Sequence, residues 1–212
     1  MKWKNALADY KHYLKLERGL SENSIKSYEL DVVKLIRFLD EHNCTDSPIS
    51  ISSSRLKEFI YEVAKVVNER SQSRIISGLK SFFNYLVFED YRADNPLELI
   101  ESPKIGRKLP DTLSIEDIDN ISGAVDLSKP EGERNRAIIE TLYGCGLRVS
   151  ELTALKLSDL FFEEGFIKVT GKGDKERFVP IANNTIKYIS IYLKEIRVHQ
   201  KINEKAYPCV TI

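Results

Sequence analysis

The sequence predicts a mainly α-helical protein with a small three-stranded antiparallel β-meander in its C-terminal half. Apolar residues recur at spacings of three and four over most of the first hundred residues, which is the period of an α-helix. Short segments rich in β-branched and aromatic residues lie between residues 159 and 181, and glycine-containing turns separate them. A chain of 212 residues is long enough for one large domain or two small ones.

Composition and charge exclude several classes of protein. The chain is 42% hydrophobic and 30% charged, as globular proteins are, and it has no apolar run long enough to cross a membrane. Its 32 basic and 32 acidic residues balance, which argues against a protein that coats nucleic acid through bulk charge but allows a local basic face. Three scattered cysteines form neither a disulfide framework nor a zinc pattern. We therefore expect a cytoplasmic protein with no metal, no cofactor and no membrane partner.

The first hundred residues are predicted to form a bundle of four amphipathic helices. The first covers residues 3–17, and the second follows a cap at Ser21 or Ser24 and ends near residue 42. Serines 52–54 are predicted to cap the third helix, and Ser71 is predicted to open the fourth.

A linker is predicted between two domains. Residues 102–110 contain two prolines and a glycine around three basic residues, a composition typical of an exposed, extended segment. We place a helical domain at residues 1–102, the basic linker at 103–111 and a second domain at 112–212.

The second domain is predicted to mix helices with the β-meander. Ser114 should cap a helix that reaches about residue 123, and a second helix should cover 131–143 until Gly144 and Gly146 interrupt it. A further helical turn is predicted near Ser150. The remaining predicted elements are strands at 159–162, 166–169 and 177–181, and a last helix that Asn183 or Asn184 caps and that extends to about residue 199.

Two positively charged residues lie where a phosphate could approach. Arg148 follows two glycines and precedes a helical turn, and Lys172 lies in a hairpin turn between two glycines. The planar fork of an arginine binds two phosphate oxygens, and a lysine can donate a proton to a leaving oxygen. Glu151 lies three residues after Arg148 on the same helical face and could fix its guanidinium. The alternatives are a solvated surface arginine and an ordinary Gly-Lys-Gly turn.

The order of these residues resembles a known family. The stretch from Leu142 to Leu152, followed by the Gly-Lys-Gly turn and the segment to Pro180, is similar to the tyrosine recombinase (phage integrase) family, and to its Xer-like members in particular. The resemblance implies that Arg148 and Lys172 are catalytic, with Glu151 in support. It also implies a SAM-like core-binding domain followed by a partial α/β catalytic domain, and a metal-independent reaction through a 3′-phosphotyrosyl intermediate.

The sequence departs from that family in its C-terminal part. No His-x-x-Arg motif occurs, and the only histidine after Lys172 is His199. Tyr188 and Tyr192 are spaced as a buried helical face, so we expect both to pack in the core. We therefore expect that the 212-residue form has no tyrosine nucleophile and is catalytically incomplete. We also expect part of the core of its second domain to be exposed, with reduced stability or aggregation.

The implied partners are double-stranded DNA and further recombinase subunits, which form tetramers on paired sites in the family. Mixed serines and basic residues suit contacts with phosphates and grooves, although a solvated helix face is the alternative. Two other functions stay open: a DNA-binding accessory factor that never cuts, and a helical adaptor that binds only protein. The candidate DNA-binding residues are Ser24, Lys26, Ser27, Ser71, Ser73, Arg74, Ser77, Lys80, Lys104, Arg107 and Lys108.

Overall fold

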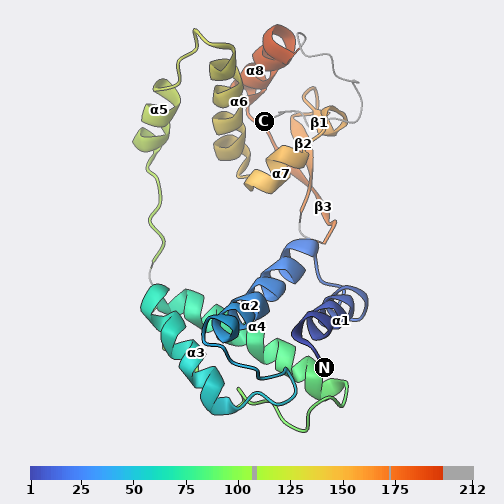
Figure 1. Ribbon diagram of the computed structural model, residues 1–212. Helices are drawn as coiled ribbons and strands as arrows, with labels where there is room; N and C mark the ends of the chain where they lie inside the picture. Colours follow the sequence, from blue (N-terminus) through green and yellow to red (C-terminus); the bar gives the residue numbers. More distant parts are fainter. Residues whose placement is uncertain (107–108, 172, 198–212) are drawn as a thin grey trace. The chain divides into compact units, whose positions relative to one another are not determined.

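A computed structural model describes residues 1–106, 109–171 and 173–197 (Figure 1). The chain divides into two compact units, Met1–Leu109 and Pro110–Ile212. It is mainly helical, with a three-stranded antiparallel sheet in the second unit, as the sequence predicted. Within the described ranges, no helix is both long and apolar enough to cross a membrane.

The N-terminal unit contains the four helices that the hydrophobic period predicted. Each buries one apolar stripe and exposes its polar face to water. The helices are α1 (Trp3–Leu16), α2 (Glu22–Glu41), α3 (Ser53–Val66) and α4 (Glu69–Phe88).

Polar side chains begin three of these helices. The Ser21 side chain accepts a hydrogen bond from the backbone N–H of Ser24 at the start of α2. At the start of α3, the Ser52 side chain accepts from the backbone N–H of Arg55. The prediction that Ser71 opens α4 is wrong by two residues. Asn68 is the N-cap, because its side-chain oxygen accepts the Ser71 N–H at 2.9 Å, and the helix begins at Glu69. Asparagine and serine cap helices equally well, so propensity alone did not select between them.

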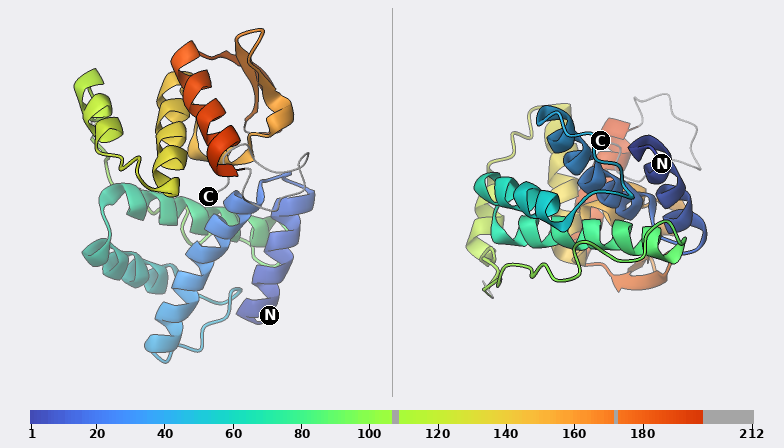
Figure 2. Two further views of the ribbon diagram at one scale, coloured as in Figure 1. Left: turned by 90° about the horizontal axis from the view of Figure 1, so that it is seen from above. Right: turned by 60° about the horizontal axis from the view of Figure 1, so that its bottom comes forward.

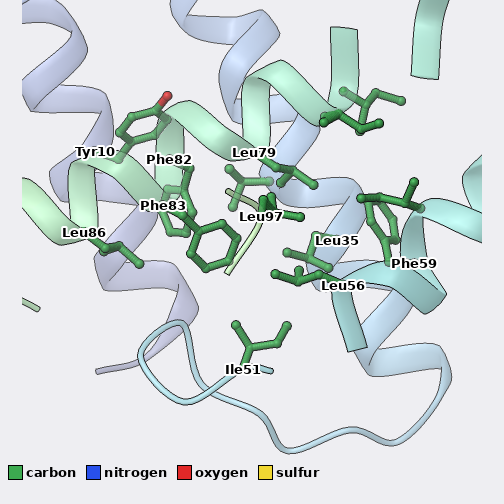
Figure 3. Packing of buried hydrophobic residues seen from close by; sticks show 14 of the residues in the cluster. Tyr10, Leu35, Ile51, Leu56, Phe59, Leu79, Phe82, Phe83, Leu86 and Leu97 are labelled. Carbon is green, nitrogen blue, oxygen red and sulfur yellow. The ribbon is translucent and has the colours of Figure 1, made fainter. Parts of the chain in front are cut away.

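The core of this unit is aromatic as well as aliphatic (Figure 3). Tyr10 is fully buried, and its ring meets the ring of Phe82 edge-on with 5.3 Å between the centroids. Its hydroxyl donates to Ser81 Oγ at 2.8 Å, so the buried polar group is satisfied. This packing fixes α1 against α4, and α2 packs against both helices.

The second unit combines helices with the small sheet. Its helices α6 and α8 pack side by side, as Figures 1 and 2 show from different directions. The elements are α5 (Ile115–Gly123), α6 (Pro130–Cys145), α7 (Val149–Ala154), a 3₁₀ turn η1 (Leu157–Asp159), β1 (Leu160–Phe161), β2 (Phe166–Thr170), β3 (Glu176–Pro180), α8 (Asn183–Ile191) and a π-helical turn η2 (Tyr192–Ile196).

The sheet confirms the predicted meander. Its strand order is β1-β2-β3, and both pairings are antiparallel. Ile167 and Val169 of β2 point into the core, and Val169 lies opposite Arg177 of β3. The alternation of side chains along β2 thus determines which residues of the hairpin face the helices. Tyr192 is fully buried and Tyr188 packs against the same core, as expected from their spacing.

Two predictions at helix ends are wrong. Gly144 does not interrupt α6, which continues to Cys145, and only Gly146 adopts the left-handed conformation at the C-cap, with φ 59°. Gly144 instead allows α8 to approach, because a Cβ there would lie 2.6 Å from Thr185 Oγ1. The helix α8 begins after Ala182, which offers no side-chain cap, and not after Asn183 or Asn184.

Candidate active site and nucleic-acid interface

Arg148 lies at the junction of α6 and α7. The left-handed Gly146 ends α6, the chain turns, and Arg148 precedes the first residue of α7 in an extended conformation. Its side chain is 75% exposed. The glycine before it and the short helix after it therefore present the guanidinium to solvent.

Glu151 is the residue that holds Arg148. Its side chain is only 3% exposed, although it carries a carboxylate. Oε1 accepts from Nη1 of Arg148 at 3.0 Å, and Oε2 accepts the backbone N–H of Arg148 at 2.9 Å. The same carboxylate therefore fixes both the backbone and the side chain of Arg148.

Arg177 completes this cluster from a distant part of the chain. Its Nη1 donates to Glu151 Oε1 at 2.8 Å and its Nη2 donates to Oε2 at 3.0 Å. A two-pronged contact between a guanidinium and a carboxylate is strong and directional. It ties β3 to α7 across 26 residues of sequence.

The sequence analysis did not assign a role to Arg177. The signal that could have found it is Glu151, because an acidic residue on the inner side of a short helix needs a cationic partner. Arg177 is the arginine that follows the predicted hairpin turn. It lies two residues before the apolar Val179 on the last strand, so the two side chains share one face.

The surrounding charges keep Glu151 ionised. Hydrogen bonds from Arg177, and then from the backbone and side chain of Arg148, lower the pKa of the Glu151 carboxyl to about 2, against the opposing effect of burial. With two guanidinium groups and one carboxylate, the cluster carries a net positive charge at neutral pH. Among the described residues, Nη1 is the only guanidinium nitrogen of Arg148 with a hydrogen bond, so its other N–H groups are available to an anion.

The hairpin between β2 and β3 passes directly beside this cluster. A Cβ at Gly171 would lie 3.3 Å from Arg177 Nη1 and 3.4 Å from Glu151 Oε1. The Gly171 N–H donates to the Lys175 carbonyl at 2.8 Å and closes the turn. Lys172, the predicted proton donor, is the next residue after Gly171 and lies outside the described residues.

Several of the predicted DNA-binding residues meet between α2 and α4. They line an open pocket of about 370 Å³, which we call the α2–α4 pocket. Of the predicted residues it contains Ser24, Ser27, Arg74 and Ser77, and the other lining residues are Asn23, Tyr28, Asp31 and Gly78.

The other predicted residues are placed differently. Lys26 is exposed on α2 and Lys104 is exposed before the second unit, while Arg107 and Lys108 lie outside the described residues. Lys80 is half-buried and donates to the Glu98 carbonyl at 3.3 Å. Ser71 and Ser73 are half-buried near the start of α4. The structure therefore does not bring all of these residues to one place.

Asp31 is a pocket residue that the sequence analysis missed. It is 1% exposed, and its Oδ2 accepts from Nη2 of Arg74 at 2.6 Å. The signal was an acidic residue that precedes Val32 within the apolar stripe of α2.

No cluster of three metal-ligating side chains occurs in the described part of the chain. The chemistry that the arrangement can perform is anion binding, through the anchored and exposed guanidinium of Arg148 in the second unit. The α2–α4 pocket in the first unit adds a separate set of hydrogen-bonding groups.

Both units of the chain match known protein families. A family model described as "Phage integrase, N-terminal SAM-like domain" matches residues 7–90, and one described as "Phage integrase family" matches residues 111–207. Tyrosine recombinase XerD of Listeria innocua is 37% identical over 190 residues, which cover 89% of this chain and 64% of the relative. XerD of Oceanobacillus iheyensis is 37% identical over 193 residues, which cover 91% of this chain and 65% of that relative. The chain thus spans slightly less than two thirds of the length of these relatives.

Solved structures show the same fold at lower identity. A lambda integrase dimer bound to a COC′ core site is 18% identical with a TM-score of 0.73, over 99% of this chain and 60% of that chain. A XerH site-specific recombinase bound to a palindromic difH substrate is 22% identical with a TM-score of 0.67, over 95% of this chain and 61% of that chain.

Proposed function

The chain belongs to the phage integrase family of tyrosine recombinases, and on this basis we propose that it acts in site-specific recombination of double-stranded DNA. Arg148 binds the non-bridging oxygens of the scissile phosphate, and Glu151 positions it. Lys172 donates a proton to the leaving 5′ oxygen as a tyrosine forms the 3′-phosphotyrosyl link. Residues 1–102 act as the DNA-binding domain, 103–111 as the basic linker and 112–212 as part of the catalytic domain.

The observation that carries this proposal is the anchored but exposed guanidinium of Arg148. A free surface arginine loses side-chain entropy when it binds an anion. Here the hydrogen bond to Glu151 Oε1 removes much of that loss in advance, while 75% of the side chain stays accessible. Such pre-organised donors stabilise the charge that develops on a phosphate during displacement.

Contacts to the DNA backbone should come from the exposed basic residues. Lys26 on α2 and Lys104 in the linker are exposed, and each can neutralise one phosphate. Further recombinase subunits on a paired site, and a cytoplasmic location, belong to the same proposal.

The strand-cleavage step requires groups that these 212 residues do not supply. The sequence contains no His-x-x-Arg motif, and the buried Tyr192 packs in the core. We therefore propose that the 212-residue chain binds DNA but forms no covalent link to it.

Binding and cleavage are tested separately. In the first test, fluorescence anisotropy with a labelled random-sequence duplex should give an affinity that falls as salt rises from 50 to 200 mM, by about tenfold or more if a few phosphates are contacted. The change Arg148→Ala should weaken binding, whereas Lys156→Ala, a nearby cationic control outside the cluster, should have a smaller effect. An affinity independent of salt would contradict DNA binding.

In the second test, the chain is mixed with a nicked duplex that traps covalent intermediates and carries a sequence selected by the protein itself. We expect no covalent product from the 212-residue chain. We expect product when the C-terminal third of the Listeria innocua relative is joined to it. Covalent product from the 212 residues alone would refute the proposed incompleteness.

A second candidate function is a DNA-binding accessory factor that never cuts. If the extended chain binds the selected duplex but remains inactive, this second function is supported.

A further inference from the structure

The buried carboxylate of Asp31 and the half-exposed guanidinium of Arg74 form an ion pair in the α2–α4 pocket. Nη2 of Arg74 donates to Asp31 Oδ2 at 2.6 Å and to the Ser27 carbonyl at 3.0 Å. The Asp31 side chain is 1% exposed, whereas that of Arg74 is 49% exposed. One end of the guanidinium is thus fixed inside the protein and the other faces the pocket.

Stability does not explain the position of Asp31. Its second oxygen, Oδ1, is buried and has no hydrogen-bond partner within the described part of the chain. A buried, unsatisfied carboxylate oxygen destabilises a fold, and an ion pair at such a site does not by itself repay that loss. An apolar residue would pack more favourably beside Val32. The carboxylate therefore acts on Arg74 rather than on the core.

The neighbouring helix leaves room for this carboxylate. Gly78 of α4 is buried, and a Cβ at that position would lie 2.2 Å from Asp31 Oδ2. Any other residue would displace the carboxylate or separate α2 from α4. The pair thus depends on a glycine one helical turn after Arg74.

The ion pair with Asp31 changes how Arg74 can contact DNA in two ways. Because Asp31 neutralises the charge of Arg74, the pair attracts phosphates less than a free arginine would. Because Nη2 of the guanidinium is held by Asp31, the orientation of its remaining N–H groups is restrained beside a pocket that Ser24 and Ser77 help to line. Hydrogen-bond acceptors on base edges are read by donors of defined direction.

We infer that Asp31 is a positioning residue that makes Arg74 a reader of base-edge acceptors rather than a phosphate anchor. This inference rests on the proposed function, since it requires α2 and α4 to face DNA. In this arrangement the α2–α4 pocket distinguishes one DNA sequence from another, and exposed residues such as Lys26 raise the affinity for any duplex.

The experiment is selection of bound duplexes from a randomised pool, followed by anisotropy titrations of the selected duplex and of a scrambled duplex. The wild-type chain should prefer the selected duplex. Asp31→Asn keeps the size of the side chain and removes its charge, so we expect about tenfold less discrimination. The same change should tighten binding to the scrambled duplex and make the salt dependence steeper.

Two matched variants separate positioning from simple charge. Arg74→Lys keeps the charge without the planar fork, so discrimination should fall as in Asp31→Asn. Lys26→Ala removes an exposed charge on the same helix, so both duplexes should bind more weakly by the same factor, with the salt slope reduced by about one. Circular dichroism and a thermal melt check that each variant is folded. If Asp31→Asn does not fold, Arg74→Lys decides alone, because it leaves the buried carboxylate in place.

The outcomes are distinct. Unchanged discrimination in folded Asp31→Asn, or in Arg74→Lys, overturns the inference while leaving the proposed function intact. A wild-type chain that selects no sequence but still binds duplex with a salt-dependent affinity also overturns it. A wild-type chain that binds no duplex overturns both.

Discussion

Arg177 in β3 and Glu151 in α7 form a two-pronged ion pair, with nitrogen–oxygen distances of 2.8 and 3.0 Å, although 26 residues separate them in the sequence. The same carboxylate also holds Arg148. The strand hairpin and the turn that carries Arg148 are therefore fixed to one another through a single buried side chain.

Removing Arg177 should destabilise the second unit. Arg177→Ala leaves the buried Glu151 carboxylate with only Arg148, and breaking a buried ion pair by removing one partner typically costs about 3–5 kcal/mol. Since the Arg177 side chain is 41% exposed, we expect a smaller loss of about 2 kcal/mol, measured by urea denaturation. Lys175→Ala, two residues earlier in the same hairpin, should change stability by less than about 0.5 kcal/mol. Equal effects of both changes would show that the ion pair contributes nothing.

Acid should weaken the same cluster. The pKa of Glu151 is lowered to about 2 by Arg177 and Arg148, from an ordinary value of 4.5. The contribution of ionised Glu151 to the free energy of unfolding is fully present above about pH 4.5 and is lost as pH falls toward 2. Because both guanidinium groups are partly exposed and screened, we expect a loss of about 1–2 kcal/mol in that interval. Glu151→Gln should remove this part of the pH dependence, and an unchanged acid profile in that variant would contradict the assignment.

Asp31 should give the opposite pH dependence. Burial raises the pKa of its carboxyl from 3.8 to about 6, although Arg74 on α4 and Lys34 on α2 oppose the rise. Tyr10 of α1 and Tyr28 of α2 are further titratable groups near it. In the folded chain Asp31 binds its proton more tightly than in the unfolded chain, so stability should fall by about 2–3 kcal/mol as pH rises from 4 to 6. Chemical denaturation of wild type and Asp31→Asn across this range checks the sign. A wild-type profile parallel to that of Asp31→Asn would refute it.

Two helical glycines should respond differently to alanine. At Gly144 a Cβ would meet Thr185 Oγ1 at 2.6 Å, so Gly144→Ala should lose about 1–3 kcal/mol through overpacking between α6 and α8. At Gly123, near the end of α5, no atom lies within 4 Å of an added Cβ. There alanine should stabilise the helix by up to about 1 kcal/mol. Thermal denaturation of both variants makes the comparison, and adding Thr185→Ala to Gly144→Ala should restore part of the loss.

The helical bundle and the meander could be predicted because they depend on local periodicity. The stripe of apolar residues on α2 and the alternating Ile167 and Val169 of β2 are visible in the sequence itself. Helix ends were less certain. At α4, Asn68 and Ser71 have similar capping propensities, so the sequence did not select between them. At α8, the helix begins after Ala182 although two asparagines with better capping propensity follow it.

The sequence by itself determined the helical and strand segments, the turn that exposes Arg148 and the position of Glu151 beside it. Only the tertiary structure decided that Arg177 shares the Glu151 carboxylate and that Asp31 lies beneath Arg74. Pattern reasoning follows the spacing of residues along one element. Both of these ion pairs join different elements, so they form only when packing brings each buried carboxylate to its cationic partner.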